Sequence, residues 1–169
     1  MSNKVDFKRA IYAGSFDPVT YGHIDLIKRA REIFPEVIVA VAHNLHKRPI
    51  FSVEERRRML EKAILDMPGV LIDDFKGLVV DYARHKNAKV LIRGVRMISD
   101  FEYEFQMALT NRKLASDIET IFLMPNESYS YISSRLLKEA ASLGADLSCF
   151  LPLHVMKALR KRLNEVKYK

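Results

Sequence analysis

The sequence is poor in the features that build secreted and membrane proteins. Its 169 residues contain one cysteine, Cys149, which excludes an internal disulfide. No apolar run approaches the ~20 residues that a membrane-spanning helix needs. The first residues also lack the apolar core of a signal peptide. We therefore expect a cytoplasmic protein without a membrane partner.

Glycine-rich nucleotide-binding motifs are also missing. The six glycines form neither the three-glycine dinucleotide fingerprint nor the Gly-Lys-Ser/Thr end of a P-loop. These absences argue against NAD binding and against a Walker-type ATPase. The pair His43-x-x-His46 has no cysteine, aspartate or third histidine with it, so no protein metal site is expected.

Negative charge is in short supply. Lys and Arg number 28 against 21 Asp and Glu, a formal net charge of +7. The excess predicts an anionic partner, and composition leaves nucleic acid, lipid and small phosphate esters open. The run Arg56–Arg58 and the basic residues near the C-terminus are most simply solvated helix faces. Lys47, Arg93 and Arg96 differ, because they fall in loops or at strand ends where a ligand can bind.

Short apolar runs alternate with helical patterns along the chain. The expected strands are 9–13, 37–42, 70–73, 90–92 and 120–123, and the expected helices are 22–34, 53–67, 78–86, 100–115, 133–143 and 153–166. This alternation predicts an α/β fold: a Rossmann-like, doubly wound parallel sheet of five strands with helices on both faces and a C-terminal helix. The length predicts a single domain, residues 1–169.

Several local signals mark the expected helix boundaries. Ser52 with Glu55 and Ser99 with Glu102 have the Ser-x-x-Glu spacing of a capping box, which predicts two helix starts. Pro68-Gly69 predicts the end of the second helix, and Gly144 predicts the end of a later one.

The stretch from Gly14 to His23 is the most informative part of the sequence. It joins the first expected strand to the first expected helix, and it places His23 in that helix's first turn. Free backbone N–H groups and the positive end of the helix dipole make such a turn a phosphate site. Ser15 adds a hydroxyl, and Asp17-Pro18 is expected to shape the loop.

Other polar residues follow the remaining strands. Lys47 follows the second strand, the segment from Arg93 to Arg96 follows the fourth, and Ser128 to Ser134 follow the fifth. Ligands of open parallel sheets bind outside the carboxyl ends of the strands. The sequence therefore predicts one cationic, hydroxyl-rich rim suited to phosphate esters.

Four motifs carry a resemblance to a known family. Gly-Ser-Phe-Asp-Pro at 14–18 followed by Thr-x-Gly-His at 20–23 resembles the signature of the nucleotidylyltransferase superfamily. The stretches 47–56 (KRPIFSVEER), 91–104 and 129–134 (YSYISS) follow in the order and spacing of bacterial phosphopantetheine adenylyltransferases. The resemblance covers about residues 8–160.

The resemblance implies a reaction and a set of site residues. The reaction is reversible transfer of the adenylyl group of ATP to 4′-phosphopantetheine, which gives dephospho-coenzyme A and pyrophosphate, the penultimate step of coenzyme A biosynthesis. The implied catalytic residues are His23, as transition-state stabiliser, Lys47 and Arg93. The implied ATP-binding residues are Ser15, Phe16, His23, Gly94, Val95, Arg96, Glu104, Tyr129, Ser130, Tyr131, Ile132, Ser133, Ser134 and Arg135. The implied substrate-binding residues are Ser15, Lys47, Leu78, Val79 and Arg93.

The chemistry of this reaction fits those residue types. A phosphate monoester with a second pKa near ~6 is already mostly a dianion at neutral pH, so it needs no strong base. The protein must instead align two anions and stabilise the charge that builds on the α-phosphoryl group, without a covalent intermediate. Mg²⁺ is expected to arrive with ATP. The resemblance also implies a homohexamer.

Three residues depart from the family pattern: Tyr21, His46 and Arg135. Leu137, followed by Lys138, stands where related enzymes for other substrates carry an arginine. One rival hypothesis is a nucleotidylyltransferase for another acceptor, such as nicotinamide or nicotinate mononucleotide. A second is a non-catalytic RNA-binding protein that uses the basic C-terminal helix, and it predicts salt-sensitive binding without pyrophosphate release.

Overall fold

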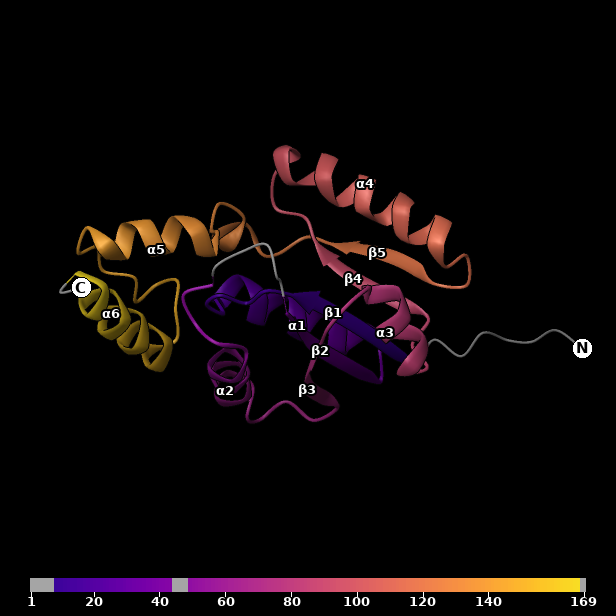
Figure 1. The fold of residues 1–169 in the computed structure, drawn as a ribbon, viewed down its shortest axis with the longest axis horizontal. Coiled ribbons are helices and arrows are strands. Elements are labelled where there is room, and N and C mark those ends of the chain that lie inside the picture. The colour runs from indigo at the N-terminus through magenta and orange to yellow at the C-terminus, as the bar shows by residue number, and fades with distance from the viewer. Residues whose placement is uncertain (1–7, 44–48, 168–169) are drawn as a thin grey trace, which may run out of the picture.

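A sheet of five parallel strands forms the centre of the molecule (Figure 1). The computed structural model describes residues 8–43 and 49–167. The strands are β1 (Arg9–Gly14), β2 (Glu36–Ala42), β3 (Val70–Phe75), β4 (Val90–Gly94) and β5 (Glu119–Leu123), in the order β3-β2-β1-β4-β5. The chain winds outward from β1 to β3 and then returns to place β4 beside β1. The reversal of strand order therefore lies between β1 and β4, where such sheets bind ligands.

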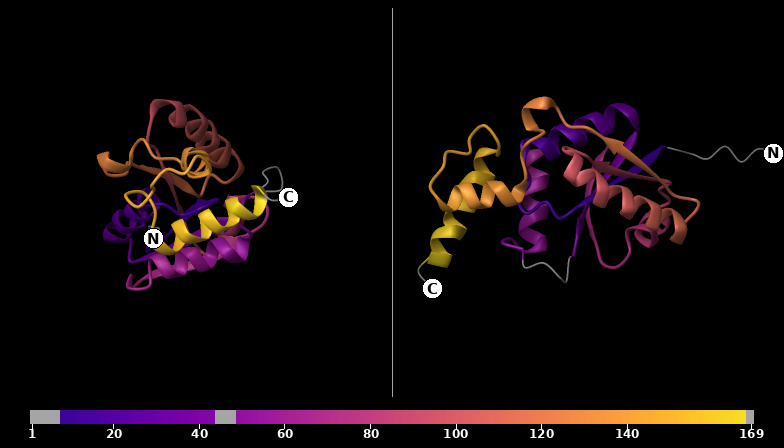
Figure 2. Two further views of the ribbon diagram at one scale, coloured as in Figure 1. Left: turned by 90° about the vertical axis from the view of Figure 1, so that its left-hand side faces the viewer. Right: turned by 90° about the horizontal axis from the view of Figure 1, so that it is seen from above.

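Helices cover both faces of the sheet, which confirms the predicted doubly wound fold. The face formed by alternate residues such as Val39 packs against Ile27 of α1 (Tyr21–Ile33) and Leu60 of α2 (Val53–Ala63). On the opposite face Ile38 packs with Val80 of α3 (Val79–His85), and α4 (Ile98–Leu114) lies beside β5 (Figures 1 and 2). Strands buried on both faces account for the nearly continuous apolar runs of β1, β2 and β4.

The last two helices lie beyond the carboxyl ends of the strands (Figures 1 and 2). They are α5 (Ser134–Ser142) and α6 (Leu153–Lys167). Leu137, Val155 and Leu159 from these helices are buried in the same apolar cluster as Leu60. The C-terminal helices are therefore anchored to the core at the edge of the sheet where the site residues were predicted.

The two predicted capping boxes have different outcomes. Ser52 and Glu55 form the reciprocal bonds of a box at the start of α2, which confirms that prediction. The prediction for Ser99 with Glu102 is wrong, because α4 begins at Ile98 and its N-cap, Met97, makes no side-chain capping bond. The chain keeps an extended conformation only as far as Met97, so Ser99 already lies inside the first helical turn.

The C-terminal ends of α2 and α5 can be compared with their predicted positions. α2 ends at Ala63, before the predicted limit of Met67, and a turn closed by the Met67 N–H and the Ile64 carbonyl leads to Pro68-Gly69. α5 ends at Ser142, and Gly144 follows with a positive φ of 87°, as its sequence signal predicted. The short 3₁₀ helix η1 (Glu127–Tyr129) was not predicted.

Helix α4 leaves a set of large apolar side chains in solvent. Ile98, Phe101, Phe105 and Leu109 are exposed on it, and the rings of Phe101 and Phe105 stack with centroids 5.5 Å apart. We call these four residues the α4 apolar face. They do not mark a membrane span, since no helix within the described ranges is long and apolar enough for one.

Candidate active site

A cavity of about 630 Å³ opens at the carboxyl ends of β1 and β4. The start of α1 and the start of α5 form its other walls. Eleven of the predicted site residues line it: Ser15, Phe16, His23, Arg93, Gly94, Arg96, Glu104, Ile132, Ser133, Ser134 and Arg135. The fold thus brings together residues from four separate stretches of sequence at the strand-order reversal.

The other predicted site residues do not line this cavity. Val95 and Tyr131 adjoin lining residues in the chain, and Tyr129 and Ser130 directly precede Tyr131, but none of the four is in the wall itself. Leu78 and Val79, predicted to form a groove for the acceptor, lie at the start of α3, where Leu78 is exposed. Lys47, the predicted ligand of the acceptor phosphate, and His46, a departure from the family pattern, lie outside the described ranges.

The loop after β1 has a compact, ordered core. Phe16 is buried with a positive φ of 47°, an uncommon conformation for a non-glycine residue. Its ring makes edge contacts with Tyr12, at 5.4 Å between centroids, and with His23, at 5.1 Å. These contacts fix the loop and restrain one side of the imidazole.

His23 is the third residue of α1 and takes part in its capping box. The Thr20 backbone N–H donates to His23 Nδ1 at 3.0 Å, and the His23 N–H donates to Thr20 Oγ1 at 3.3 Å. Burial, and then the nearby Arg96 charge, lower the pKa of His23 to about 4. At pH 7 the imidazole is therefore neutral, with Nδ1 as an acceptor. The proton lies on Nε2, which makes Nε2 the hydrogen-bond donor.

Arg93 and Glu104 form a two-pronged ion pair at the wall of the cavity. Arg93 Nε and Nη2 donate to the two carboxylate oxygens of Glu104, both at 2.6 Å. Arg93 Nη1 donates to the carbonyl of Ala13 at the end of β1. A guanidinium has five N–H bonds, so two remain for a ligand. The pair therefore fixes one edge of the Arg93 guanidinium, and the two remaining N–H bonds can donate to an anion.

Arg96, in the cavity wall, connects the first turn of α4 with the segment before α5. Its Nε donates to Asp100 Oδ2 in the first turn of α4 at 2.9 Å, and its Nη1 donates to the carbonyl of Ile132 before α5. Ser133 is the N-cap of α5, and its hydroxyl accepts from the Leu136 N–H at 3.1 Å. The N-terminus of α5 thus faces the same cavity as two arginines, which is an arrangement suited to phosphate groups.

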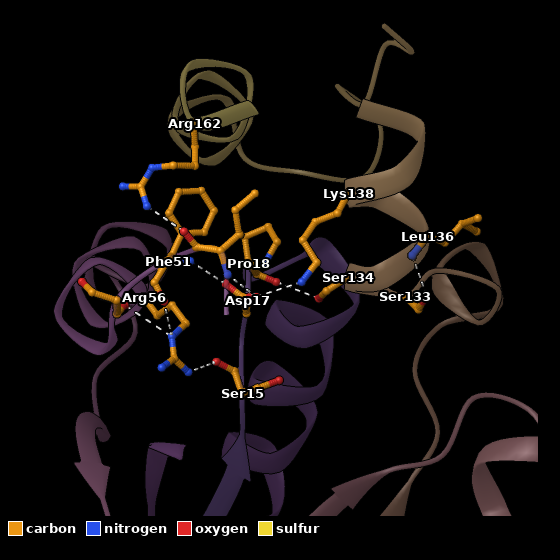
Figure 3. Close-up of polar contacts among 12 residues, drawn as sticks. Ser15, Asp17, Pro18, Phe51, Arg56, Ser133, Ser134, Leu136, Lys138 and Arg162 are labelled. Atoms are coloured by element: carbon orange, nitrogen blue, oxygen red, sulfur yellow. Dashed lines mark hydrogen bonds and ion pairs between the residues drawn. The ribbon is translucent and has the colours of Figure 1, made fainter. Parts of the chain in front are cut away.

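Three charged residues line the cavity without having been predicted as site residues: Asp17, which was expected only to shape the loop, Arg56 and Lys138 (Figure 3). The interpretation of Arg56 as part of a solvated helix face is wrong. Arg56 is only 2% exposed, and it donates to the carbonyls of Ser15, Ala42, Phe51 and Ser52. Burial lowers its pKa, and the charge of Asp17 acts in the opposite direction. The neighbouring Arg58 is exposed as expected.

The departures Tyr21 and Arg135 have different surroundings. Tyr21 begins α1, and its N–H donates to the Phe150 carbonyl at 3.0 Å, which ties this helix to the C-terminal segment. Its ring lies 6.3 Å from that of Tyr129. Arg135 is exposed in the first turn of α5 and lines the cavity. Arg135 therefore adds a cation to the predicted phosphate cradle.

The carboxylates in the cavity wall are already engaged. Asp17 pairs with Lys138 and Glu104 pairs with Arg93. Within residues 8–43 and 49–167, no group of three or more His, Cys, Asp or Glu side chains could hold a metal ion. In the sequence pair His43-x-x-His46, His43 Nε2 lies 2.6 Å from Asp74 Oδ2.

Solved structures with this fold include enzymes that act on nucleotides. A protein from Vibrio parahaemolyticus described as a nicotinate-nucleotide adenylyltransferase has a TM-score of 0.67 at 16% identity, over 92% of this chain and 93% of that one. A bifunctional NMN adenylyltransferase/ADP-ribose pyrophosphatase from Francisella tularensis, complexed with AMP and a manganese ion, has a TM-score of 0.63 at 15% identity. It matches 96% of this chain and 53% of its own length. At these identities the likeness shows the fold alone.

Sequence relatives are much closer. The phosphopantetheine adenylyltransferase of Alkaliphilus metalliredigens is 53% identical over 155 residues, which cover 92% of this chain and 99% of the relative. That of Dictyoglomus thermophilum is 52% identical over 91% of this chain and 94% of its own. The model of the cytidylyltransferase-like family matches residues 11–140. The chain therefore belongs to the cytidylyltransferase-like family and, among its members, to the phosphopantetheine adenylyltransferases.

Proposed function

We propose that this chain transfers the adenylyl group of ATP to 4′-phosphopantetheine and releases pyrophosphate and dephospho-coenzyme A, the penultimate step of coenzyme A biosynthesis. The observation that carries the proposal is a neutral histidine at a helix N-terminus, in one cavity with a second helix N-terminus and two arginines. That site suits two phosphate-bearing substrates. Relatives that are 52–53% identical and are named phosphopantetheine adenylyltransferases support the choice of acceptor.

The reaction is a single in-line displacement. A phosphate oxygen of the acceptor forms a bond to the α-phosphorus of ATP while the bond from that phosphorus to the pyrophosphate oxygen breaks. The acceptor oxygen is already ionised at neutral pH, so no side chain has to remove a proton. No covalent bond to the protein forms in this scheme.

His23 stabilises the transition state by donation. Its Nε2–H is available because Nδ1 accepts from Thr20 and the imidazole is neutral at pH 7. Negative charge on the α-phosphoryl oxygens strengthens this hydrogen bond as the transition state is approached. The N-terminus of α1 adds its dipole in the same place.

The two substrates bind to different parts of the site. Arg93 and Lys47 hold the acceptor phosphate, Ser15 contacts phosphate oxygens of both substrates, and Leu78 and Val79 contact the pantetheine arm. Glu104 orients Arg93 through their ion pair and accepts from the nucleotide. The remaining ATP contacts come from Phe16, Gly94 to Arg96 and the segment from Tyr129 to Arg135.

Mg²⁺ accompanies ATP in this proposal. The donor set fits an ion held by phosphate oxygens and water, because Asp17 and Glu104 in the cavity wall are already ion-paired. The ion would supply charge neutralisation for the leaving pyrophosphate. The residues of the chain supply alignment and the donor on His23.

The resemblance implies a homohexamer, and the α4 apolar face supports self-association of this chain. A surface of exposed Phe, Ile and Leu side chains on one helix is typical of a protein–protein contact. Light scattering should give about six times the chain mass of 19.5 kDa. The double variant Phe101→Glu/Leu109→Glu should shift the protein to a smaller species, whereas a monomeric wild type would contradict the proposal. We also propose a cytoplasmic location.

One assay tests the reaction and the acceptor together. The purified chain is incubated with Mg·ATP and, separately, with 4′-phosphopantetheine, nicotinate mononucleotide and nicotinamide mononucleotide. Pyrophosphate is measured by a coupled reaction and the adenylylated product by mass spectrometry. Of the three acceptors, we expect only 4′-phosphopantetheine to give both pyrophosphate and adenylylated product. Product with a pyridine mononucleotide and none with 4′-phosphopantetheine would overturn the assignment.

A further inference from the structure

Asp17 accepts hydrogen bonds from two segments that are distant in sequence. Its side chain is only 7% exposed. The backbone N–H groups of Ile50 and Phe51 both donate to it at 3.0 Å, and Lys138 Nζ of α5 donates at 2.8 Å (Figure 3). One carboxylate therefore connects the loop after β1, the chain that leads into α2, and α5.

Arg56 makes the reciprocal connection. It lies on α2, and its guanidinium donates back to the Ser15 carbonyl at 2.6 Å and to the Phe51 carbonyl at 3.1 Å. In the β1–α1 loop, the Asp17 carboxylate accepts from the backbone just before α2. In α2, the Arg56 guanidinium donates to the backbone of that loop. We call these reciprocal contacts of Asp17 and Arg56 the cross-brace. The cross-brace resists displacement of either segment, because a shift would break several buried hydrogen bonds at once.

The cross-brace reaches the wall of the nucleotide cavity. Asp17, Arg56 and Lys138 all line the cavity that contains His23. The Ser134 hydroxyl donates to the Pro18 carbonyl at 2.8 Å, so α5 is tied to the loop a second time, next to the Lys138 contact. Donors on α5 and donors on the β1–α1 loop are therefore held at a fixed spacing across the cavity.

We infer that Asp17 is a positioning residue for adenylyl transfer: its carboxylate holds the ammonium of Lys138 and the backbone of residues 50–51 in place against the loop that carries Ser15 and His23. Asp17 need not touch either substrate. It acts by fixing the groups that align them, and small misplacements of such groups are costly in rate. This inference rests on the proposed function.

Asp17→Asn separates positioning from simple electrostatics. The amide has nearly the size of the carboxylate, but it cannot accept from all three donors, because its NH₂ group would face another donor. Removal of a negative charge beside the cavity should leave the affinity for ATP unchanged or make it a few-fold tighter. Positioning predicts the opposite sign for turnover, with a kcat lower by roughly tenfold.

The matched control is Asp117→Asn. Asp117 is also ion-paired, to Arg84 and Lys89, and it precedes β5 at the amino ends of the strands, away from the cavity. Each variant and the wild type are compared for Tm, for ATP affinity by calorimetry and for kcat well below Tm. We expect a lower Tm for both variants, and a lower kcat only for Asp17→Asn.

A double variant tests the route through Lys138. If Asp17 acts by holding Lys138, then Lys138→Met lowers kcat as well, and Asp17→Asn/Lys138→Met is no slower than the slower single variant. Full multiplication of the two losses would overturn that route. A kcat for Asp17→Asn equal to that of Asp117→Asn would overturn the inference itself. Should Asp17→Asn fail to fold, an unchanged kcat in Lys138→Met overturns it.

The positioning role of Asp17 and the proposed acceptor can fail independently of each other. If the wild type adenylylates another phosphate ester but not 4′-phosphopantetheine, the proposed acceptor is wrong. The same variants are then compared with that ester, and the expected kcat loss of Asp17→Asn is the same. Retention of full kcat with the ester that the wild type uses would overturn the positioning role alone.

Discussion

Replacement of His23 by alanine should remove one donor and one cap at the same time. The donor is Nε2–H, which donates a hydrogen bond to the α-phosphoryl group in the proposed mechanism. Loss of a single preorganised donor of this kind costs about 3 kcal/mol of transition-state stabilisation, or on the order of 10²-fold or more in kcat. The cap is the bond from the Thr20 N–H to Nδ1, worth about 1 kcal/mol of folding stability.

Two further variants separate these effects. Glutamine at the third helical position can reach back to the N-cap N–H, so His23→Gln should keep most of the stability and still lose roughly tenfold or more in kcat. Ser52→Ala removes the corresponding capping bond of α2 and should lose about 1 kcal/mol without a change in kcat.

The assays are pyrophosphate release at saturating substrates, calorimetry for ATP affinity and urea unfolding. We expect His23→Ala to bind ATP within a few-fold of the wild type, since the donor acts mainly in the transition state. A variant with near-normal kcat and only a raised KM for ATP would refute this reasoning. So would an activity loss in Ser52→Ala as large as that in His23→Ala.

Three other predictions concern charge and packing. Because burial lowers the pKa of His23 to about 4, against about 6.5 in the unfolded chain, its contribution to stability is present above pH 6.5 and is lost as the pH falls toward 4. NMR should show this imidazole still neutral at pH 5.5, and a midpoint near 6.5 would contradict the burial argument. Alanine at Lys47 or Arg93 should weaken acceptor binding by about 2 kcal/mol and ATP binding much less, as measured by calorimetry. Gly94→Ala should lose about 1–3 kcal/mol in urea unfolding, because its Cβ would lie 2.5 Å from Leu26 Cδ1, and a wild-type midpoint would contradict this.

The fold was predictable because its signals are local. Buried strands such as β2 are almost continuously apolar, and the Ser52–Glu55 box lies within four residues. The start of α4 was not predictable in the same way. Its large apolar residues, such as Ile98 and Phe101, are exposed, so the apolar pattern does not mark the core-facing side. A chance Ser-x-x-Glu spacing then indicated the wrong first turn.

The site was predictable where one residue follows one strand. Ser15 and Arg93 lie at strand ends, His23 lies in the first turn of the helix that follows β1, and parallel strands bring their carboxyl ends to one edge. Asp17 and Arg56 could not be assigned that way, because most of their partners lie in other segments of the chain. Asp17 accepts from Ile50 and Lys138, and Arg56 donates to the carbonyls of Ser15 and Ala42. Burial of an arginine in a run of three depends on tertiary packing that the run does not encode.

The stereochemistry at the α-phosphorus tests the central claim, which is a direct transfer between two aligned phosphates. The wild-type chain is given one diastereomer of ATP with sulfur on the α-phosphoryl group, together with 4′-phosphopantetheine and Mg²⁺, and the configuration of the product is determined. A single in-line displacement inverts this centre, so inversion is expected. Retention would require two displacements through a covalent intermediate and would contradict the account.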